Sequence, residues 1–339
     1  MHFFTSFTFS YLNRACALAY TLKAYNPRST LWAVITDDPP PGVDCDKLLK
    51  MFDHIIWSKD LLGPDADAWL FQHNVIEACT GVKGLAAKYI LANYPVPEIV
   101  YLDPDIAVFS RLSELDRAFG SSSILLTPHQ LAPEAADNHQ AITDNEIGSL
   151  KWGVYNLGFI GIKRSHTGLA FLDWWASRLI NWCFDDVPQG LFTDQRWIDL
   201  VPALFDEVEI IKHPGYNVAS WNLSRRTLRF SQTGAATVNG FPLRFFHFTK
   251  LGPIGQSMTE RYSGESLAVW ELWRGYKELI AKFTISGIPE GYWAYGNYSD
   301  GSKISMADRI AYRTTASLRD RYQKPFDVAL GLKATIRAS

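Results

Sequence analysis

The stretch I-V-Y-L-D-P-D-I-A-V-F, residues 99–109, indicates both the class of fold and the place of a candidate site. Its first four residues are apolar, β-branched or aromatic, which is typical of a strand buried on both faces of a sheet. Pro104 cannot donate to a sheet ladder, so the strand is predicted to stop at Asp103 and Asp105. Ligands bind at the carboxyl ends of strands in open α/β sheets. Two interpretations remain open here: ligands of a Mg²⁺ or Mn²⁺ ion that also holds substrate phosphate, or a polar turn that caps the next element.

The chain before this stretch reads as alternating strands and helices. Residues 2–10 have a strand composition, 11–25 have helical core spacing, and 31–36 form a second apolar run. This β-α-β pattern predicts a parallel sheet. A short strand is expected at 54–57, and a helical region at 74–94 leads into the strand at 99.

The chain after this stretch continues the alternation around one long exception. Residues 128–149 show no apolar period and are predicted to be a loop, functional or mobile because of its length. Thr193 is a plausible N-cap for one of the later helices. We expect strands at 121–127, 153–164, 208–212 and 243–248, and helices at 168–182, 192–205 and 265–283.

Composition sets the broad class of the protein. The 339 residues are 47% hydrophobic and 20% charged, which indicates a globular chain of about two domains or one enlarged domain. A net charge of −2 gives no field for nucleic acid. The four cysteines are far apart, the N-terminus lacks the features of a signal peptide, and no apolar run could span a membrane. We therefore expect a cytoplasmic protein with reduced thiols.

The last part of the chain is basic. Residues 301–339 hold eight lysines and arginines against three aspartates. Such a tail can lie on an anionic membrane, at about 1 kcal/mol per basic residue near the surface. A solvated helical tail packed on the domain is the alternative, which charge runs favour. Peripheral contact with the inner face of the membrane therefore stays open.

Five motifs occur in order over residues 1–255. They are Tyr11 after the first strand, a lysine on the helix before the aspartates (Lys83, with Lys88 as alternate), Y-L-D-P-D, the strand Y-N-L-G-F-I-G-I at 155–162, and Asp194-Gln195 opening a helix, with H-F-T-K at 247–250 further on. Together they resemble nucleotide-sugar glycosyltransferases of the GT-A fold, in particular the retaining branch that contains glycogenin and lipooligosaccharide galactosyltransferases. Several longer stretches look closest to bacterial transferases of surface-polysaccharide clusters.

The resemblance implies an α/β fold with a GT-A-like, Rossmann-type mixed sheet flanked by helices and a basic helical C-terminal extension. It places a catalytic domain at 1–255, with a donor half of about 1–110 and an acceptor half of about 111–255. Residues 256–339 would be an extension packed on that domain. The implied activity is transfer of a sugar, with retention, from a UDP-sugar to a glycan or lipid-linked acceptor in surface polysaccharide synthesis.

The family's metal and phosphate ligands map onto specific positions. Asp103, Asp105 and His247 would hold Mn²⁺ or Mg²⁺, which acts as a Lewis acid on the leaving diphosphate. A structural histidine at a strand end is the alternative for His247. Lys250 would contact the diphosphate as a point charge, although the family has glycine there and its lysine further along. Gly252 (and Gly255) would let the backbone approach the phosphates.

The remaining donor contacts map onto both halves. Tyr11, Lys83 and Gly158 are expected to bind the donor, and Asn156, Asp194 and Gln195 to face the reacting side of the sugar, stabilising oxocarbenium character. A bulged strand and a helix cap are the structural alternatives for Asn156 and Asp194. No general base is assigned, because in the retaining branch the leaving diphosphate can take the acceptor proton.

Acceptor contacts are expected from the loop at 128–151, which contains His129, Glu134, Asp137 and His139, and from Trp221 and Asn222, for which core packing is equally plausible. His213 is expected to be structural. Two other functions stay open. One is a metal-dependent nucleotidyltransferase or phosphohydrolase, for which a glycine- and lysine-rich phosphate motif near strand one is missing. The other is a degenerate transferase that binds glycans or acts as a scaffold.

Overall fold

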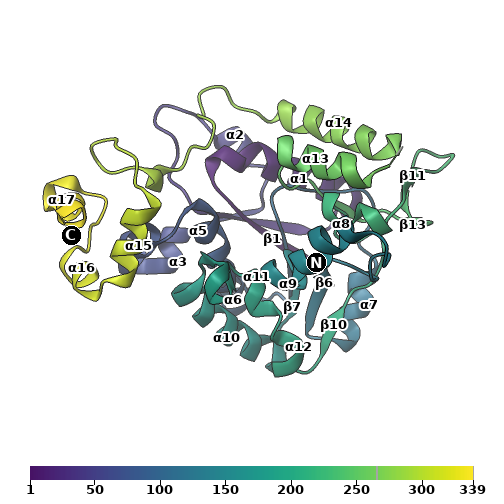
Figure 1. Ribbon diagram of the computed structural model, residues 1–339, viewed down its shortest axis with the longest axis horizontal. Coiled ribbons are helices and arrows are strands. Elements are labelled where there is room, and N and C mark those ends of the chain that lie inside the picture. The colour runs from purple at the N-terminus through teal and green to yellow at the C-terminus, as the bar shows by residue number, and fades with distance from the viewer. Residues whose placement is uncertain (265, 339) are drawn as a thin grey trace.

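The computed structural model describes residues 1–264 and 266–338. A seven-stranded mixed sheet crosses the molecule, with helices above and below it (Figure 1). Its strand order is β10-β6-β7-β4-β1-β2-β3, so the predicted α/β mixed sheet flanked by helices is confirmed. The strands are β1 (His2–Phe7), β2 (Thr30–Ile35), β3 (His54–Trp57), β4 (Glu98–Leu102), β6 (Ile124–Pro128), β7 (Tyr155–Lys163) and β10 (Val208–Ile210).

The strands β4, β1, β2 and β3 are parallel, whereas β7 runs antiparallel to both of its neighbours. β1 runs parallel to both β2 and β4, as the β-α-β pattern predicted. β7 pairs antiparallel with β4 on one side and with β6 on the other. The carboxyl end of β4 therefore lies beside the middle of β7, where Leu102 pairs with Phe159.

Both faces of the sheet are covered, which explains why β1 and β4 are continuous apolar runs. Phe4 and Tyr101 point into one core, beneath α5 (Val75–Gly81), α6 (Lys83–Asn93) and α10 (His166–Trp182). Phe3 and Val100 point into the other, with α1 (Leu12–Tyr25) and α7 (Glu114–Ser121). A Cβ on Gly84 would lie 2.7 Å from the Cα of Ala176, so this glycine lets α6 and α10 pack closely.

A small second sheet carries the end of the quoted stretch. β5 (Ile106–Val108) pairs antiparallel with β14 (Phe245–His247), and Ile106 is opposite His247. The amide of Phe248 also donates to the carbonyl of Asp105 over 2.9 Å. This pairing brings a histidine more than 140 residues away beside the Asp-Pro-Asp turn.

Two predictions of secondary structure are wrong. The predicted loop at 128–149 contains α8 (His139–Ala141), the π-helix η3 (Ile142–Ile147) and α9 (Gly148–Trp152). The buried residues of this segment are the small or polar Ala141, Asn145 and Gly148, so its buried face shows no apolar period. The predicted helix at 192–205 is two short helices, α11 (Gln195–Ile198) and α12 (Val201–Leu204). The N-cap of α11 is Asp194 and not Thr193, which lies one residue earlier in a turn with a φ of 46°.

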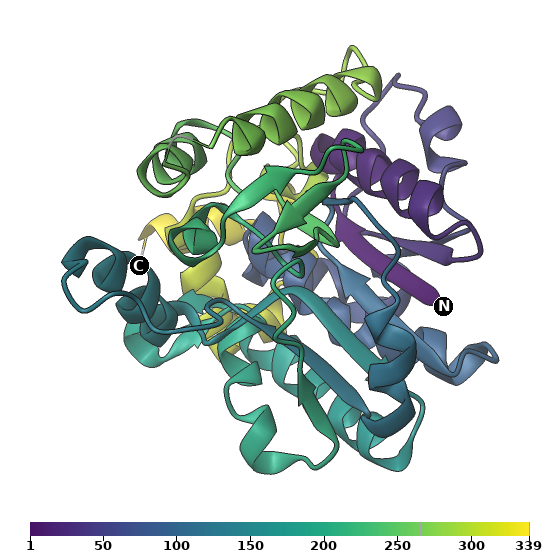
Figure 2. The same cartoon turned by 90° about the vertical axis from the view of Figure 1, so that its right-hand side faces the viewer.

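The C-terminal extension is helical and returns to the sheet. α13 (Pro253–Tyr262) and α14 (Leu267–Lys282) come first, and Figure 2 shows α14 lying along α1. The chain then runs back to the carboxyl end of β2, where the Trp293 indole donates to the carbonyl of Thr36 over 2.9 Å. The extension ends in α15 (Met306–Thr314), α16 (Ala316–Arg321) and α17 (Leu332–Ala338). Glu265, the first residue of a predicted helix, and Ser339, the last of the basic tail, lie outside the described residues.

Within residues 1–264 and 266–338, no helix is long and apolar enough to cross a lipid bilayer. The remaining elements are short. They are α2 (Asp46–Leu49), α3 (Ser58–Leu62), α4 (Ala66–Gln72), β8 (Asp185–Asp186), β9 (Leu191–Phe192), β11 (Leu228–Phe230), β12 (Ala236–Val238), β13 (Phe241–Pro242) and the 3₁₀ helices η1 (Phe9–Tyr11), η2 (Gly63–Asp65), η4 (Val187–Gln189), η5 (Ser220–Arg225), η6 (Ala294–Gly296) and η7 (Val328–Leu330).

Candidate active site

Asp103, Asp105 and His247 meet at the carboxyl end of β4. His247 Nε2 lies 3.0 Å from a carboxylate oxygen of Asp105 and 3.5 Å from one of Asp103. One ligand atom from each residue lies within 4.8 Å of the other two. Two carboxylates and one imidazole suit Mn²⁺ better than a soft metal, and they fit Mg²⁺ less well because of the nitrogen ligand. The residues present therefore fit a divalent ion whose other positions would face the cleft.

Gly158 makes room for His247. A Cβ at this position would lie 2.6 Å from Nδ1 and Cε1 of the His247 ring. The Gly158 carbonyl accepts the amide of Asp103 over 2.9 Å, which fixes the turn that carries the first carboxylate. Burial lowers the pKa of His247, but the negative charges of Asp105 and Asp103 raise it by more, so the net shift of the pKa is upward. Gly158 thus leaves space for the His247 ring and holds the backbone of Asp103 in place.

Lys83 lies between the candidate metal ligand Asp103 and the second acidic residue, Asp194. Its side chain is 2% exposed, and Nζ lies 2.8 Å from Asp194, 3.4 Å from Asp103 and 4.0 Å from the centre of the Tyr101 ring. Burial lowers the pKa of Lys83, but Asp103 and Asp194 outweigh it and the lysine stays charged. The alternate lysine, Lys88, pairs with Asp173 on the surface. Of the two lysines, Lys83 lines the cleft and Lys88 does not.

Asp194 is buried at the floor of the cleft. Burial raises its pKa, and the ammonium of Lys83 limits that rise. The Thr193 hydroxyl also donates to it over 3.1 Å. Asp103 is the second carboxylate beside Lys83, and its Oδ1 accepts a hydrogen bond from the Tyr101 hydroxyl over 2.7 Å. Asp103 thus holds Lys83 and Tyr101 with one oxygen and offers the other to His247.

The Asn156 amide is fully engaged by the protein. Its oxygen accepts from the amide of Gly158 and from Asn217, over 3.0 and 2.9 Å. Its nitrogen lies 3.2 Å from His129 Nε2 and 3.4 Å from the Gln195 oxygen. Burial lowers the pKa of His129 to about 4, so this ring is neutral at pH 7 and can accept. Asn156 therefore connects β7 to His129, Gln195 and Asn217, and both hydrogens of its amide are used.

Gln195 is held in the same network. Its oxygen accepts the amide of Leu157 over 3.1 Å, and its nitrogen donates to the carbonyl of Trp152 over 2.7 Å. Gly153 has a φ of 118°, and a Cβ there would lie 3.0 Å from Gln195 Cγ. The second amide hydrogen of Gln195 is not used by these bonds, so this side chain can still donate to a ligand.

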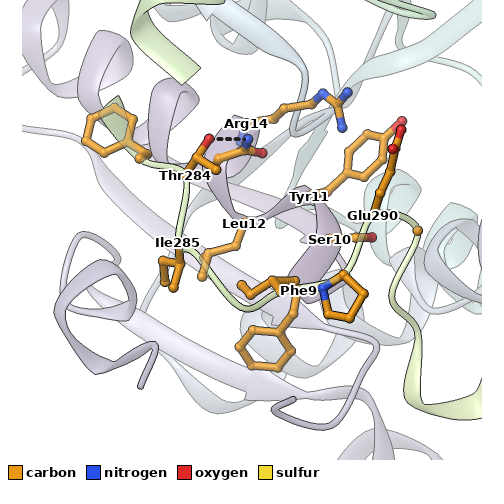
Figure 3. A pocket seen from close by; sticks show the side chains of 13 residues that line it. Phe9, Ser10, Tyr11, Leu12, Arg14, Thr284, Ile285 and Glu290 are labelled. Atoms are coloured by element: carbon orange, nitrogen blue, oxygen red, sulfur yellow. Dashed lines mark hydrogen bonds between the residues drawn. The ribbon is translucent and has the colours of Figure 1, made fainter. Parts of the chain in front are cut away.

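Tyr11 lies where two cavities meet. It lines the main cleft, of about 770 Å³, and a neighbouring pocket of about 460 Å³ shown in Figure 3. The guanidinium of Arg14 lies 4.1 Å from the centre of the Tyr11 ring. Burial raises the pKa of Asp105, whereas His247 and then Arg14 lower it, and the net shift is downward. Arg14 is therefore close to the candidate metal ligands.

The segment after His247 has an irregular backbone. Lys250 has a φ of 51° and lines the cleft. Gly255 N donates to the Lys250 carbonyl over 3.1 Å, and a Cβ on Gly255 would lie 2.2 Å from that oxygen, so this glycine is required by the turn itself. Gly252 is the N-cap of α13 and is not among the residues that line the cleft.

The far wall of the cleft is the helical segment 139–152. Asp144 accepts from the Tyr262 hydroxyl over 2.7 Å and pairs with Arg261, which ties this wall to α13. Ile76 and Trp152 are exposed at the cleft although they are apolar. The cleft thus has a polar floor and partly apolar walls.

The acceptor-side predictions divide. Trp221 lines the cleft, with its ring 5.4 Å from that of His247. His129 also lines it, whereas Glu134 turns inward to Asn145 and Ser224. Asn222 is buried and donates to the carbonyls of Asn217 and His129. Two further residues of the predicted acceptor loop, Asp137 and His139, lie outside the cleft. His213, which was expected to be structural, lies outside it as well.

Sequence reasoning missed four contributors to the site: Arg14, Tyr101, Trp152 and Asn217. Tyr101 lies two residues before Asp103, so alternation along β4 could have revealed that both side chains point the same way. Arg14 is one helical turn after Tyr11, a spacing that places two side chains on one face. Nothing in the sequence marks Trp152 or Asn217.

No family model matches the chain. "Uncharacterized protein YfnF" of Bacillus subtilis (strain 168) is 28% identical over 174 residues, which are 51% of this chain and 56% of that protein. "Uncharacterized protein YfnD" of the same organism is 23% identical over 176 residues, 51% and 53% of the two chains. The chain spans about half the length of the curated relatives it matches.

The chain is also similar to solved structures. One is the galactosyltransferase LgtC in complex with donor and acceptor sugar analogues, with a TM-score of 0.48 and 14% identity, covering 86% of this chain and 98% of that one. Mouse xyloside xylosyltransferase 1, in its apo form, gives 0.42 and 14%, covering 74% and 98%. The glycosyltransferase GlyE of Streptococcus pneumoniae TIGR4 gives 0.46 and 13%, covering 83% and 62%. All three are named as glycosyltransferases, the class that the sequence motifs resemble.

Proposed function

We propose that this protein is a divalent-metal-dependent glycosyltransferase that moves a sugar from a nucleotide sugar, a UDP-sugar in the first instance, to a glycan or lipid-linked acceptor. The observation that carries the proposal is the convergence of Asp103, Asp105 and His247 at the carboxyl end of β4, in a cleft of about 770 Å³. The five sequence motifs support it, since residues from all five line this one cleft.

The charges of the cleft suit a diphosphate leaving group. Asp103, Asp105 and His247 would hold Mn²⁺ or Mg²⁺, which supplies a Lewis acid for the negative charge that develops as the sugar leaves. Tyr101 and Lys83 fix one oxygen of Asp103 and leave the other free for the ion. Lys250 is exposed at the cleft and can approach the phosphates.

The floor of the cleft suits the sugar. Asp194 is buried there as a carboxylate paired with Lys83, and it can stabilise positive charge at the anomeric carbon without leaving its position. Gln195 keeps one amide hydrogen for a sugar hydroxyl. Asn156 holds the backbone of β7 in place through its bonds to Gly158 and Asn217, which makes it a positioning residue in this scheme.

We infer a retaining outcome. Asp194 is the buried carboxylate at the sugar face and is ion-paired with Lys83, so we assign it to electrostatic stabilisation and not to deprotonation of the acceptor. The departing diphosphate would then take the acceptor proton on the same face of the sugar. The acceptor would enter between Trp221 and Trp152, where aromatic rings can stack on the apolar face of a sugar.

The test is a thermal-shift screen of UDP-, GDP- and dTDP-sugars with Mn²⁺ or with EDTA, followed by donor hydrolysis assays. A ligand that binds only the native state raises the melting temperature. We expect stabilisation by one nucleotide sugar that requires Mn²⁺. Asp105→Asn should abolish the metal-dependent shift and reduce donor hydrolysis by about hundredfold or more. Its apo melting temperature should change little, because asparagine can still accept a hydrogen bond from His247.

Asp116→Asn is the matched control, since Asp116 is an exposed aspartate on α7 that pairs only with Arg111 across 3.7 Å. Full donor turnover in EDTA would refute the metal-dependent mechanism. If no nucleotide sugar shifts the wild-type protein, a scaffold or glycan-binding role replaces the proposal. Release of phosphate or pyrophosphate from a nucleotide without sugar transfer would indicate a phosphohydrolase or nucleotidyltransferase.

A further inference from the structure

One long stretch of the chain lacks acidic residues although much of it lies at the surface. Aspartate and glutamate make up 35 of the 339 residues, yet none occurs between Glu209 and Glu260. Two arginines of this stretch are engaged within the protein, Arg226 with backbone carbonyls and Arg244 with Glu114. Four other basic side chains are exposed: Lys212, Arg225, Arg229 and Lys250. Among the described residues, none of these four forms an ion pair.

The small antiparallel sheet β11-β12-β13 presents two of these cations. Leu228 on β11 is opposite Val238 on β12, and both are buried in the core that includes Trp273 of α14. Because side chains alternate along a strand, Arg229 lies on the opposite, outer face of β11. Figure 2 shows this small sheet on the side of the molecule that faces the viewer, beside α14.

Each end of the small sheet combines an exposed aromatic ring with an arginine. Phe230, which is 43% exposed, directly follows Arg229 at the end of β11. Phe241, which is 51% exposed, begins β13 at the other end. The side chain of Asn239 in the preceding turn donates to the carbonyl of Arg225 over 3.1 Å, which holds Arg225 beside that turn. We call these four residues, Arg225, Arg229, Phe230 and Phe241, the small-sheet surface.

The chemistry of the small-sheet surface suits an anionic lipid bilayer. Guanidinium groups attract anionic head groups, and aromatic rings partition into the interface between head groups and acyl chains. Single-stranded nucleic acid also pairs basic and aromatic side chains, but it binds in a groove that follows its backbone. None of the four residues lines either cavity described above, and the net charge of −2 gives no field for nucleic acid.

The basic C-terminal tail is the other candidate for contact with lipid. Half of its eight lysines and arginines are engaged within the protein: Arg309 and Arg319 donate to backbone carbonyls, Arg313 pairs with Glu77, and Lys333 pairs with Asp300. Three aspartates lie among them in the sequence: Asp308, Asp320 and Asp327. The tail therefore offers fewer free cations than its composition indicates, and acidic groups are interspersed, whereas the acid-free stretch contains none.

We propose that the small-sheet surface is a docking site for an anionic lipid bilayer. This goes beyond the proposed function, which concerns the chemistry of the cleft. The same acid-free stretch supplies Trp221 and Lys250 to the cleft. A lipid-linked acceptor held in that bilayer would therefore be presented close to the acceptor side of the cleft.

The experiment measures binding of the whole chain to vesicles of phosphatidylcholine mixed with phosphatidylglycerol, and to vesicles of phosphatidylcholine alone. The wild-type protein should bind the mixed vesicles at low salt and more weakly at about 0.15 M salt, because salt screens the attraction. Arg225→Ala/Arg229→Ala should weaken this binding by about tenfold or more, since each basic residue at an anionic surface contributes about fivefold. Donor hydrolysis in solution should not change, because neither arginine lines the cleft.

The aromatic half of the surface is tested separately. Phe230→Ser/Phe241→Ser should weaken binding to the mixed vesicles by a factor that is the same at low and at high salt, because ring insertion is not screened. The melting temperature of each variant shows whether it is folded at the temperature of the measurement.

Lys303→Ala/Lys324→Ala is the matched control, because it removes two exposed cations from the tail instead. It should change vesicle binding by less than about twofold. A loss in this variant as large as that of Arg225→Ala/Arg229→Ala would overturn the proposal and assign the contact to the tail.

Three other results would also overturn the proposal. They are unchanged binding by the arginine variant, equal binding of the wild-type protein to both kinds of vesicle, and no binding to either. In the last case, a dimer in sedimentation equilibrium that the arginine variant cannot form would identify the surface as an interface between two copies of the chain. Vesicle binding without binding of any nucleotide sugar would refute the proposed function alone.

Discussion

Two buried cations, Lys83 beneath the cleft and Arg309 beneath the C-terminal helices, are satisfied in opposite ways. Lys83 lies between the carboxylates of Asp103 and Asp194. Arg309 is 3% exposed and donates only to backbone carbonyls, those of Leu70, Phe71 and Tyr295, over 2.7–3.2 Å. Burial lowers the pKa of Arg309 to about 10, while the acids around Lys83 raise its pKa.

The difference reflects what each region does. Carbonyls satisfy the donors of Arg309 without any charged group that a substrate could reach, and so they join the extension to the end of α4. The carboxylates around Lys83 keep strong electric fields at the floor of a cleft, where they can act on a ligand. The polar contacts of Arg309 stabilise the packing of the C-terminal helices, whereas those of Lys83 keep charged groups beside the cleft.

The largest effect is expected from removing the cation beneath the cleft. Lys83→Met should destabilise the protein by about 3–5 kcal/mol, because Asp194 would be left as an uncompensated buried charge. Combining it with Asp194→Asn should recover part of this loss without restoring transfer. Urea unfolding at pH 7 measures both. Lys88→Met is the control: its exposed pair with Asp173 should contribute at most about 1 kcal/mol. If Lys83→Met lost no more stability than Lys88→Met, this explanation would be wrong.

A smaller effect is expected from the cation of the C-terminal region. Arg309→Met should destabilise by about 2–3 kcal/mol, since it leaves neutral carbonyls rather than a charge without partners. The Mn²⁺- and nucleotide-dependent thermal shifts should persist in this variant and disappear in Lys83→Met. Arg337→Met, at an exposed position of α17, should change neither stability nor binding. Loss of ligand binding by Arg309→Met at a temperature where it is folded would show that the two regions are coupled.

The smallest effect concerns pH and the same C-terminal region. His73 is buried against Trp69 and Phe184, and burial, aided by Arg313 and Arg309, lowers its pKa to about 3. The unfolded chain therefore binds more protons than the folded one between about pH 3 and 6.5, so stability falls as pH falls through 6.5. From pH 7 to 5.5 this histidine should account for about 1 kcal/mol.

His73→Gln should make urea unfolding less sensitive to this pH change, by about that amount. His166→Gln, at an exposed position on α10, should not alter the pH dependence. An unchanged slope in His73→Gln would mean that His73 can be protonated in the folded protein.

The sequence by itself determined the central elements and the first carboxylates. The apolar runs at 31–36 and 99–102 became β2 and β4, and the break at Pro104 was expected because proline has no amide hydrogen. These features depend on neighbouring residues, so a local pattern is sufficient. The motif order also selected residues from both halves of the chain that line one cleft.

Tertiary structure decided the rest. The segment 139–152 folds as helices because it packs between the cleft and α13, through contacts such as that of Asp144 with Tyr262, which no local period reveals. Pairing of β5 with β14 sets His247 beside Asp105, and this register brings three candidate metal ligands together from distant parts of the chain. The position of Lys83 and not Lys88 at the cleft and the saturation of Asn156 likewise depend on which side chains meet across the sheet. The sequence contains these residues, but their distances, and hence their charges and roles, are properties of the folded chain.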